Sequence, residues 1–283
     1  MLPAMFTLLL SIGTAAAATL DVCPSGCTYQ TIQPAIDAAT ATDVVEVGAG
    51  TYPAFHIRDR TDVTVRAVAG QTPIVSGTVP GSNGRGEVID IRRSERVVVA
   101  GFDVIGGTRR GITVLFADEV LLQGVTVRDT RLALGGGGAL VWGSSVVIEE
   151  GLFHNNQVTG ESAGGHLASN VDSSVTLIDT DFTDGSAPSG GAVWASGGTL
   201  DIVGGSFSGN RADAEGGGAI YMRAGTLDIT DTAFVDNDSA SQGGHLSLRL
   251  GNVANLLRVG FDGGEALGGA HISADTVTVD VTD

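Results

Sequence analysis

The 283-residue chain has no lysine, only two cysteines, and aromatic residues that make up 5 % of its length. All 15 basic residues are therefore arginine, and 32 acidic residues leave a formal net charge of −17. Residues 1–131 hold 11 arginines and 13 acidic residues (net −2), and residues 132–283 hold 4 and 19 (net −15). An acidic surface repels phosphate backbones, so we expect no nucleic-acid partner. The same charge disfavours polyanionic polysaccharides unless a cation mediates.

Long apolar runs are missing after the N-terminus. Met5 to Ile12 form an apolar segment, and Ala15 to Ala18 follow as small residues suited to cleavage. This pattern predicts a signal peptide over residues 1–18, although its N-terminal part lacks basic residues. The segment is too short to span a bilayer, and no later run approaches about 18 apolar residues. We therefore expect no transmembrane span in the mature chain and a secreted, periplasmic or outer cell-surface location.

The two cysteines stand close together, as Cys23 and Cys27, and no histidine nearby completes a zinc-binding set. In an exported protein, the simplest state for such a pair is a disulfide. We predict that it closes a small loop at the mature N-terminus.

Glycine is abundant, at 43 residues, and much of it belongs to a repeat rather than to a collagen-like period. The motif Gly-Gly-x-aliphatic begins at 137, 164, 190, 217 and 243, and a degraded copy begins at Gly268. The second glycines lie 27, 26, 27, 26 and 25 residues apart. A period of this length, with strands too closely spaced for helical crossovers, is typical of stacked β-coils.

Phenylalanine and asparagine keep the same period. A phenylalanine precedes each later glycine pair, at positions 153, 182, 207, 234 and 261, and three of the five continue as Phe-x-x-Asn. Like residues on successive coils stack at the strand spacing of about 4.8 Å. We therefore predict that Phe207 lies over Phe234, and that Asn210 lies over Asn237 in a turn ladder.

Together these patterns predict an all-β chain, a single-stranded right-handed parallel β-helix solenoid with a short N-terminal capping helix. We expect a cap over residues 19–42, holding the disulfide and a helix between Tyr29 and Ala39, then about nine coils over 43–283, most regular from 135 to 272. The strand Thr276–Val281 ends the chain without a cap. Charged Asp280 and Asp283 as guards, a covering partner, or a longer parent protein are three open explanations.

Two resemblances follow from these motifs. The Gly-Gly-Ala-Ile and Phe-x-x-Asn repeats resemble those of the chlamydial polymorphic outer membrane proteins. Residues 21–283 resemble the pectin lyase-like, right-handed parallel β-helix superfamily, with Cys23–Cys27, Tyr29–Ile36 and Gly50-Thr51-Tyr52 similar to the cap and first coil of secreted bacterial members. The Asn-Thr-Asp, Asp-Asp, Gly-His-Gly and Arg-Ile-Lys motifs of the polygalacturonate hydrolases do not occur in the sequence. Nor does a local motif fix the calcium-binding aspartates and arginine base of the lyases.

Strand alternation after each glycine pair suggests a binding stripe. If the aliphatic residue (Leu140, Leu167, Val193, Ile220, Leu246) faces inward, the residues on either side of it face outward. These include His166, Trp194, Tyr221 and His245, which we predict to bind a ligand by stacking on neutral sugar rings. The alternative is that the aromatic residues pack against a turn or the core, and that the histidines only replace alanine.

Charged residues offer further candidates. Asp201 and Asp228 occupy equivalent positions on successive units, and we interpret them as solvated repeat positions; a calcium site between them is the weaker alternative. Otherwise we expect no metal and no cofactor. Arg92, Arg93, Arg96 and the pair Arg109-Arg110 are basic clusters, interpreted as loop charges paired with acids or, alternatively, as an anionic-glycan contact.

We therefore predict a secreted or cell-surface β-helix protein, non-catalytic, acting in adhesion or glycan binding, with a glycan or a host or cell-surface component as its partner. The alternative function is a polysaccharide lyase or glycoside hydrolase with a non-standard active site. A third hypothesis is a scaffold segment of a longer surface protein.

Overall fold

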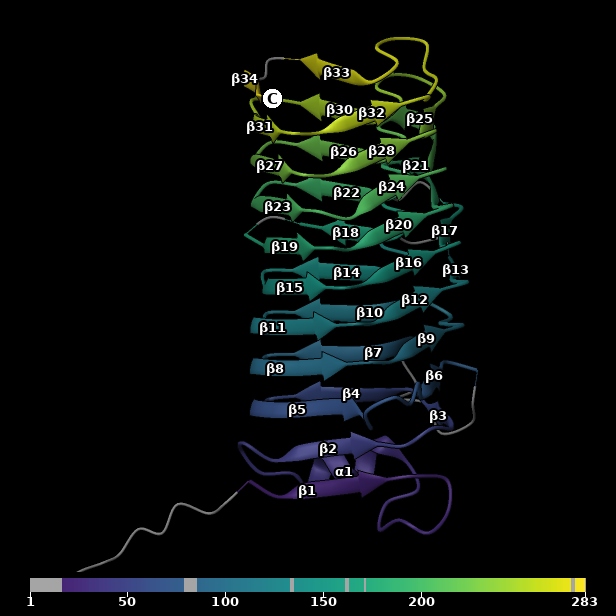
Figure 1. Cartoon of the computed structure of the whole chain (residues 1–283), viewed down its shortest axis with the longest axis vertical. Helices are drawn as coiled ribbons and strands as arrows, with labels where there is room; N and C mark the ends of the chain where they lie inside the picture. Colours follow the sequence, from purple (N-terminus) through teal and green to yellow (C-terminus); the bar gives the residue numbers. More distant parts are fainter. Residues whose placement is uncertain are drawn as a thin grey trace, which may run out of the picture.

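The chain winds into a rod of stacked β-coils (Figure 1). The computed structural model describes residues 17–78, 86–132, 135–160, 163–170, 172–275 and 278–282. It is an all-β parallel solenoid of about 10 turns, with a single helix among these residues, which confirms the predicted fold class. The predicted signal peptide, residues 1–18, lies almost entirely outside the described residues and stays a prediction.

The strands form four parallel sheets, named A to D here, and each sheet runs along the rod. Sheet A contains, in order, β1 (Thr19–Val22), β2 (Val44–Val47), β5 (Thr61–Ala67), β8 (Glu95–Ala100), β11 (Asp118–Gln123), β15 (Ser145–Glu149), β19 (Ser174–Ile178), β23 (Thr199–Val203), β27 (Thr226–Thr230), β31 (Val253–Leu257) and β34 (Thr278–Thr282). Sheet B contains β3 (Thr51–Pro53), β6 (Ile74–Ser76), β9 (Asp103–Ile105), β12 (Thr126–Arg128), β16 (Leu152–His154), β20 (Asp181–Thr183), β24 (Ser206–Ser208), β28 (Ala233–Val235) and β32 (Gly260–Asp262).

The other two sheets lie next to each other and build the candidate site. Sheet C contains β4 (Phe55–Arg58), β7 (Glu87–Arg92), β10 (Arg110–Leu115), β14 (Ala139–Trp142), β18 (Leu167–Ser169), β22 (Val193–Ser196), β26 (Ile220–Arg223), β30 (Leu246–Arg249) and β33 (Ile272–Asp275). Sheet D is shorter and contains β13 (Arg131–Leu132), β17 (Gln157–Val158), β21 (Ser186–Ser189), β25 (Arg211–Gly216) and β29 (Asp238–Ser239).

Alternation within each strand decides which side chains form the core. In β23 and β27, Leu200 pairs with Leu227 and Ile202 with Ile229, and all four side chains are buried. The residues between them point to solvent, because successive side chains of a strand face opposite sides. The interior is thus a set of aliphatic columns along the rod, and each coil adds one residue to each column.

The glycine pairs make the corner before sheet C. In four of the pairs the first glycine has a positive φ, a conformation in which a Cβ is strained: Gly164 (76°), Gly190 (59°), Gly217 (66°) and Gly243 (63°). The second glycine lies against the backbone of the next coil: a Cβ on Gly191 would come within 2.2 Å of the Gly218 oxygen. Glycine therefore recurs in this motif because the corner is sharp and the coils touch there.

Phenylalanine and asparagine stack as the sequence predicts. The Phe207 and Phe234 ring centroids are 4.8 Å apart with planes 7° from parallel. The Nδ2 of Asn210 donates to Oδ1 of Asn237 (2.8 Å) and also to the carbonyl of Phe182 (2.9 Å). Both asparagines are fully buried, so these hydrogen bonds satisfy amides that would otherwise destabilise the interior.

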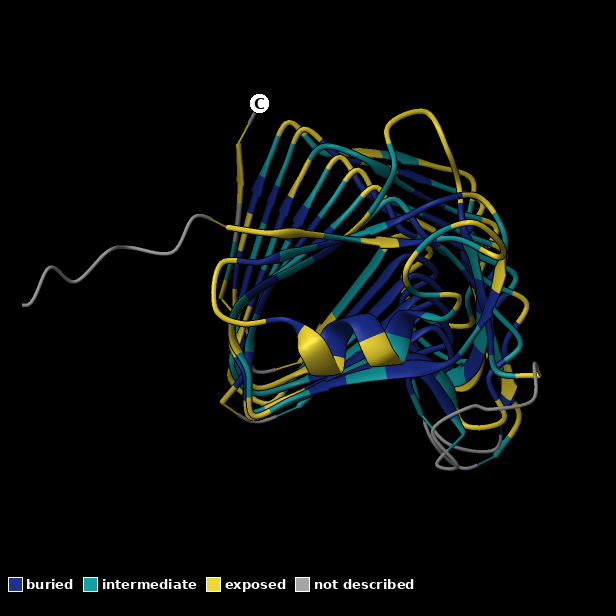
Figure 2. Cartoon of the chain, turned by 90° about the horizontal axis from the view of Figure 1, so that it is seen from below, coloured by how far each residue is buried: buried dark blue, intermediate teal, exposed yellow. Residues whose placement is uncertain are grey.

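The two ends of the rod differ. Helix α1 (Ile32–Ala38) closes the N-terminal end, with Ile32, Ala35 and Ile36 buried against the first coil (Figure 2). It is shorter than the predicted helix between Tyr29 and Ala39, but it has the predicted capping position. The predicted disulfide between Cys23 and Cys27 is present beside it.

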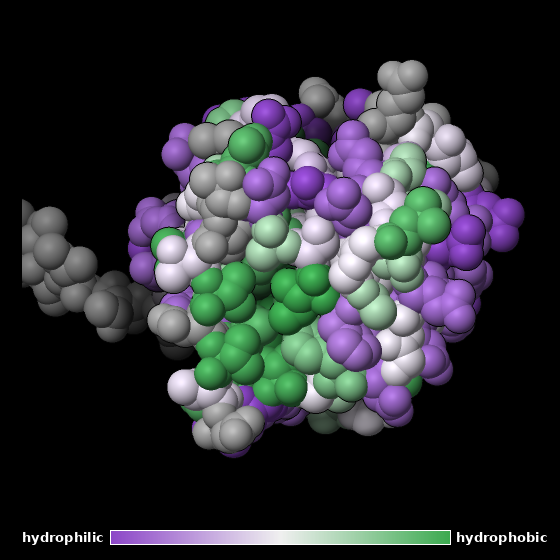
Figure 3. Space-filling model, turned by 90° about the horizontal axis from the view of Figure 1, so that it is seen from above, coloured by the Kyte–Doolittle hydropathy of each residue, from purple (hydrophilic) through white to green (hydrophobic). Residues whose placement is uncertain are grey.

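The C-terminal end has no such cover among the described residues. Hydrophobic side chains gather on this end of the rod (Figure 3). The side chain of Leu267 is 91 % exposed and that of Val281 is 66 % exposed. Asp283, one of the two predicted guards, lies outside the described residues. No helix in the described part of the chain is long and apolar enough to cross a membrane.

Candidate functional site

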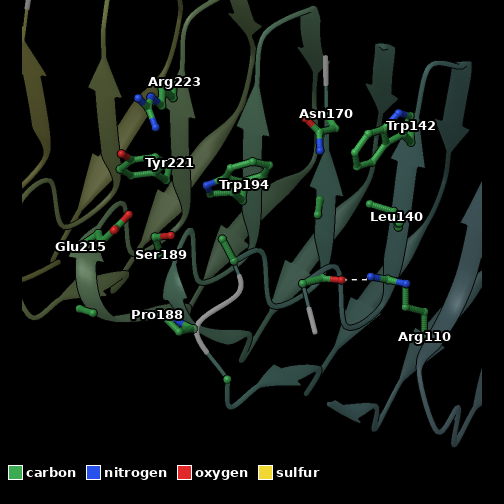
Figure 4. Close-up of a pocket in the computed structure, with 15 residues that line it drawn as sticks. Arg110, Leu140, Trp142, Asn170, Pro188, Ser189, Trp194, Glu215, Tyr221 and Arg223 are labelled. Carbon is green, nitrogen blue, oxygen red and sulfur yellow. Dashed lines mark hydrogen bonds between the residues drawn. The ribbon is translucent and has the colours of Figure 1, made fainter. Parts of the chain in front are cut away.

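A groove of about 810 Å³ opens on the outer face of sheet C, next to sheet D (Figure 4). Its floor comes from β14, β18, β22 and β26, and its wall from β21 and β25. We call this feature the aromatic groove. It is lined by Arg110, Gly135, Leu140, Trp142, Gly160, Ala163, Ala168, Asn170, Pro188, Ser189, Trp194, Ala214, Glu215, Tyr221 and Arg223.

The floor residues stand in register on successive strands. Leu140 pairs with Ala168, Ala168 with Trp194, and Trp194 with Tyr221. Trp142, two residues beyond Leu140 on β14, faces the same side and is 44 % exposed. With about 4.8 Å between adjacent strands, the floor runs for roughly 15 Å along the rod from Leu140 to Tyr221. Three aromatic rings therefore share one open surface.

The wall is made by sheet D. Pro188 and Ser189 come from β21, and Ala214 and Glu215 from β25. The register between these two strands shifts between Ala187 and Ser189, which marks a bulge. Bulges re-aim side chains and often occur beside functional sites. Figure 4 shows the Glu215 carboxylate across from the rings of Tyr221 and Trp194.

Charged groups set the electrostatics of the groove. Burial, reinforced by the nearby charge of Glu215, raises the pKa of Tyr221, so its phenol stays neutral and can donate a hydrogen bond. Burial, and then the neighbouring charge of Arg109, lowers the pKa of Arg110, but a guanidinium remains charged in proteins. The Nε of Arg110 donates to the carbonyl of Gly135 (2.9 Å) at the edge of the groove.

The structure separates the predicted stripe into two pairs. Trp194 and Tyr221 are half-buried and line the groove, so they have the predicted outward orientation. The outward orientation predicted for His166 and His245 is wrong, because both side chains are fully buried inside the coil. Strand alternation fails for them because β18 begins at Leu167 and β30 at Leu246. Each histidine therefore belongs to the corner, not to the strand.

Each buried histidine fills a gap in the asparagine ladder. The Nδ1 of His166 accepts from Nδ2 of Asn156 (2.9 Å), and its Nε2 donates to Oδ1 of Asn210 (3.2 Å). On this coil the position three after Phe182 is Gly185, where a Cβ would come within 2.4 Å of Nε2 of His166.

The second histidine repeats only part of this arrangement, because its Nε2 has no hydrogen-bond partner among the described residues. His245 accepts from Nδ2 of Asn237 (3.1 Å), and the position three after Phe261 is again a glycine, Gly264. A signal for this arrangement is present in the sequence: a coil with histidine after the glycine pair has glycine, not asparagine, three residues after its phenylalanine.

One inward prediction is also wrong. Leu140 faces the groove, because Ala139, not Leu140, pairs with Leu167. Four consecutive glycines, Gly135 to Gly138, precede this strand, and the pair that matches the other corners is Gly136-Gly137. The one-residue shift brings Trp142 into the groove, and the sequence-based prediction missed it. Glu215 was also not predicted as a lining residue, since sheet D leaves only a faint pattern. Arg110 and Arg223 were not assigned to the groove either, because they lie at the ends of their strands in sheet C, outside the stripe that the glycine pairs mark.

The predicted acidic pair is in place. Asp201 and Asp228 lie opposite each other on β23 and β27. Burial, followed by the adjacent charge of Asp228, raises the pKa of Asp201, while Nδ2 of Asn255 donates to Asp228. No group of three or more histidine, cysteine or acidic side chains in the described residues could hold a metal ion.

The predicted basic clusters separate into arginines that are paired with acids and one arginine that lines the groove. Arg93 pairs with Asp59 (2.7 Å) between turns of neighbouring coils, as predicted for loop charges. Arg96 also pairs with an acid, Asp62 (2.6 Å), but these two residues lie on the neighbouring strands β8 and β5. Arg92 and Arg109 approach the buried carboxylate of Glu87 at 3.6 and 3.7 Å. Arg110 differs from these four, because its side chain lines the aromatic groove.

Comparisons with known proteins identify the fold. The structure is similar to that of a pectin methylesterase from Aspergillus niger, with a TM-score of 0.51, 12 % sequence identity, and coverage of 94 % of this chain and 93 % of that chain. Lower similarity is found to PfbA, a surface adhesin of Streptococcus pneumoniae (TM-score 0.42, 11 % identity, 86 % of this chain and 89 % of that chain). A GH136 lacto-N-biosidase from Eubacterium ramulus is comparable (TM-score 0.43, 9 % identity, 94 % and 68 %).

These likenesses concern the fold alone. No protein-family model matches the sequence, and no curated protein does. The chain has the fold of the right-handed, pectin lyase-like β-helix proteins.

Proposed function

We propose that this protein binds a glycan in the aromatic groove, as a non-catalytic adhesion or carbohydrate-binding protein outside the cytoplasm. The observation that carries the proposal is the row of Trp142, Trp194 and Tyr221 on one open face, with polar groups around it. Binding sites for small molecules combine apolar and aromatic surfaces with a few placed polar groups. Aromatic faces suit the apolar faces of sugar rings, and the surrounding polar groups suit their hydroxyls.

The dimensions of the groove favour an elongated ligand. Trp194 and Tyr221 lie on adjacent strands, and Trp142 lies two strands before Trp194. Successive platforms are thus about 5 and 10 Å apart along the rod. A linear oligosaccharide lying parallel to the axis can contact all three.

The residues of the aromatic groove support a catalytic function less well than a binding function. Hydrolysis of a glycosidic bond ordinarily uses two carboxyl groups on either side of the scissile bond. Among the described lining residues, Glu215 alone carries a carboxylate. Binding is therefore the activity that the groove supports best.

The proposed location outside the cytoplasm draws on the disulfide and on the predicted signal peptide. Disulfides persist in oxidising compartments. Expression of the full chain followed by N-terminal sequencing tests it: we expect an exported protein that starts near Thr19, and a cytoplasmic protein that retains residue 1 would contradict it.

The experiment for binding is a glycan panel, followed by calorimetry on each positive oligosaccharide. We expect Trp194→Ala and Tyr221→Ala each to weaken binding by about 30-fold, the cost of a central aromatic contact of roughly 2 kcal/mol. Phe116→Ala is the matched control, because Phe116 is 63 % exposed and lies outside the aromatic groove. Absence of binding by the wild type across the panel, or an equal loss with Phe116→Ala, would overturn the proposal.

A further inference from the structure

Most arginines of this protein have a carboxylate partner. Of the 14 arginines that the structure describes, ten lie within 4.0 Å of an acidic side chain: Arg58, Arg66, Arg92, Arg93, Arg96, Arg109, Arg128, Arg211, Arg249 and Arg258. With 32 acidic residues in the chain, this pairing is the ordinary outcome. An arginine without a carboxylate partner is therefore unusual here.

Four described arginines have no such partner, and two of them line the aromatic groove. Arg60 donates instead to the carbonyls of Asp37 and Ala39, and Arg131 is exposed on sheet D. The remaining two are Arg110 and Arg223, both on the groove. Their positive charge is thus left for something that enters the groove.

The two cations stand at opposite ends of the groove (Figure 4). Arg110 begins β10 and Arg223 ends β26, four strand steps apart in sheet C. The separation along the rod is therefore about 19 Å. The stretch between them holds Trp142, Trp194 and Tyr221, with no further arginine among the described lining residues.

The surroundings of each arginine keep its charge available. Arg110 is half-buried, and the nearby Arg109 and Arg92 outweigh the negative charge of Glu87. Arg223 is exposed beside Tyr221 and pairs in register with Ser196 and Arg249, neither of which is acidic. A guanidinium binds a carboxylate or sulfate through two parallel hydrogen bonds, which gives both affinity and direction.

We propose that the aromatic groove selects an oligosaccharide whose anionic groups are separated from one another by neutral sugars, with one such group bound by Arg110 and another by Arg223. This inference rests on the glycan-binding function proposed above. A continuous polyanion fits less well, because its central charges would meet Glu215 and the field of a chain with net charge −17. The spacing of the anionic groups along the ligand, rather than their number, therefore determines which oligosaccharide the groove binds.

The test is calorimetry with three hexasaccharides of known charge pattern: chitohexaose, which is neutral, a hyaluronan hexasaccharide, in which every second sugar is a uronate, and hexagalacturonate, in which every sugar is charged. We expect the hyaluronan hexasaccharide to bind about tenfold more tightly than either of the other two, the effect of one additional charge-assisted hydrogen bond. Raising the salt concentration should weaken its binding and leave that of chitohexaose unchanged.

Three charge-removing variants identify the residues. Arg110→Gln and Arg223→Gln should each reduce binding of the hyaluronan hexasaccharide about tenfold. They should weaken binding of chitohexaose clearly less, because the glutamine amide can still donate a hydrogen bond to a neutral sugar. Arg131→Gln is the matched control, since it removes a carboxylate-free arginine outside the groove lining, and it should change neither affinity.

The outcomes separate this inference from the proposed function. Equal binding of the neutral and alternating probes, or unchanged binding of the alternating probe by Arg110→Gln and Arg223→Gln, overturns the inference while the glycan-binding function stands. Binding of hexagalacturonate as tight as that of the alternating probe overturns the spacing argument. No binding of any of the three probes, together with a negative glycan panel, overturns both proposals.

Discussion

At the scale of single residues, the interior depends on polar side chains that satisfy one another. Asn156, Asn210 and Asn237 form a buried ladder, and His166 replaces the missing rung where Gly185 stands. Burial lowers the pKa of His166 to about 3, so the ring is neutral in the folded protein. Its Nε2 carries the proton, because it faces an amide oxygen while Nδ1 faces an amide nitrogen.

Removing this histidine should therefore be costly. We expect His166→Ala to lower the free energy of unfolding by about 3 kcal/mol, because it leaves a cavity and two buried amides with fewer partners. The double variant His166→Ala/Gly185→Asn should recover part of the loss by restoring an asparagine to the ladder. Recovery should be incomplete, since a Cβ at residue 185 comes within 2.5 Å of the Gly191 oxygen.

Urea unfolding measures all of these variants, and His154→Ala is the control. That histidine is partly exposed on β16, and its loss should cost under about 1 kcal/mol. A double variant less stable than His166→Ala would contradict the proposed exchange between histidine and asparagine.

The same histidine predicts a pH dependence. Its pKa is lower in the folded state, at about 3, than the 6.5 of an unperturbed histidine, so the unfolded chain binds the proton more readily between these values. Stability from this group is complete above pH 6.5 and falls as the pH drops towards 3. Between pH 7 and pH 4.5 the loss should be about 2–3 kcal/mol, at 1.36 kcal/mol per pH unit below 6.5.

Comparison of the wild type with the double variant, which lacks His166, isolates the contribution of this histidine. His166→Ala/Gly185→Asn retains the same carboxylates, so its unfolding free energy should fall by about 2–3 kcal/mol less than that of the wild type over this range. An identical pH dependence in the two proteins would show that His166 is not buried as a neutral ring.

At the scale of elements, the glycine pair is the feature that sets the coil. The second glycine touches the backbone of the next coil, and Gly191→Ala would place a Cβ 2.2 Å from the Gly218 oxygen. We expect this substitution to cost at least about 3 kcal/mol, since the corner can accept a methyl group only by moving two coils apart. Gly260→Ala is the matched control, because nothing lies within 4 Å of a Cβ there.

Thermal unfolding of the two alanine variants tests the role of the corner. A Gly191→Ala protein that unfolds at the wild-type temperature would contradict it.

The elements also show how far a sequence predicts this structure. The columns of Phe207, Phe234, Asn210 and Asn237 were predictable, because a constant period brings equal residues to equal places. The orientation of His166 was not, because strand alternation does not extend into a corner. The prediction for Leu140 was shifted by one residue, because the four consecutive glycines before it leave several equivalent choices of pair.

Half of the predicted binding stripe therefore belongs to the candidate site. Trp194 and Tyr221 follow the strand alternation and reach the groove. The wall with Glu215, and the end with Arg110, depend on sheet D and on contacts between coils. Neither leaves a local signal strong enough to predict from one sequence.

At the scale of the whole molecule, the rod is a regular scaffold that carries the aromatic groove on one face. Its N-terminal end is closed by α1, and its interior is a stack of nearly identical layers. Where sheets C and D meet, large aromatic side chains and two arginines without a carboxylate partner line one open groove. The protein contains two tryptophans, Trp142 and Trp194, and both lie there.

That distribution permits a direct test of glycan binding, because all tryptophan emission of this protein comes from the aromatic groove. The measurement is tryptophan fluorescence with acrylamide quenching, during titration of wild type and Trp142→Phe with the oligosaccharides of the panel. We predict a saturable change in emission and reduced quenching with at least one oligosaccharide, retained when Trp194 is the single tryptophan. Emission and quenching that stay constant while an oligosaccharide binds by calorimetry would place the binding site elsewhere and contradict the account.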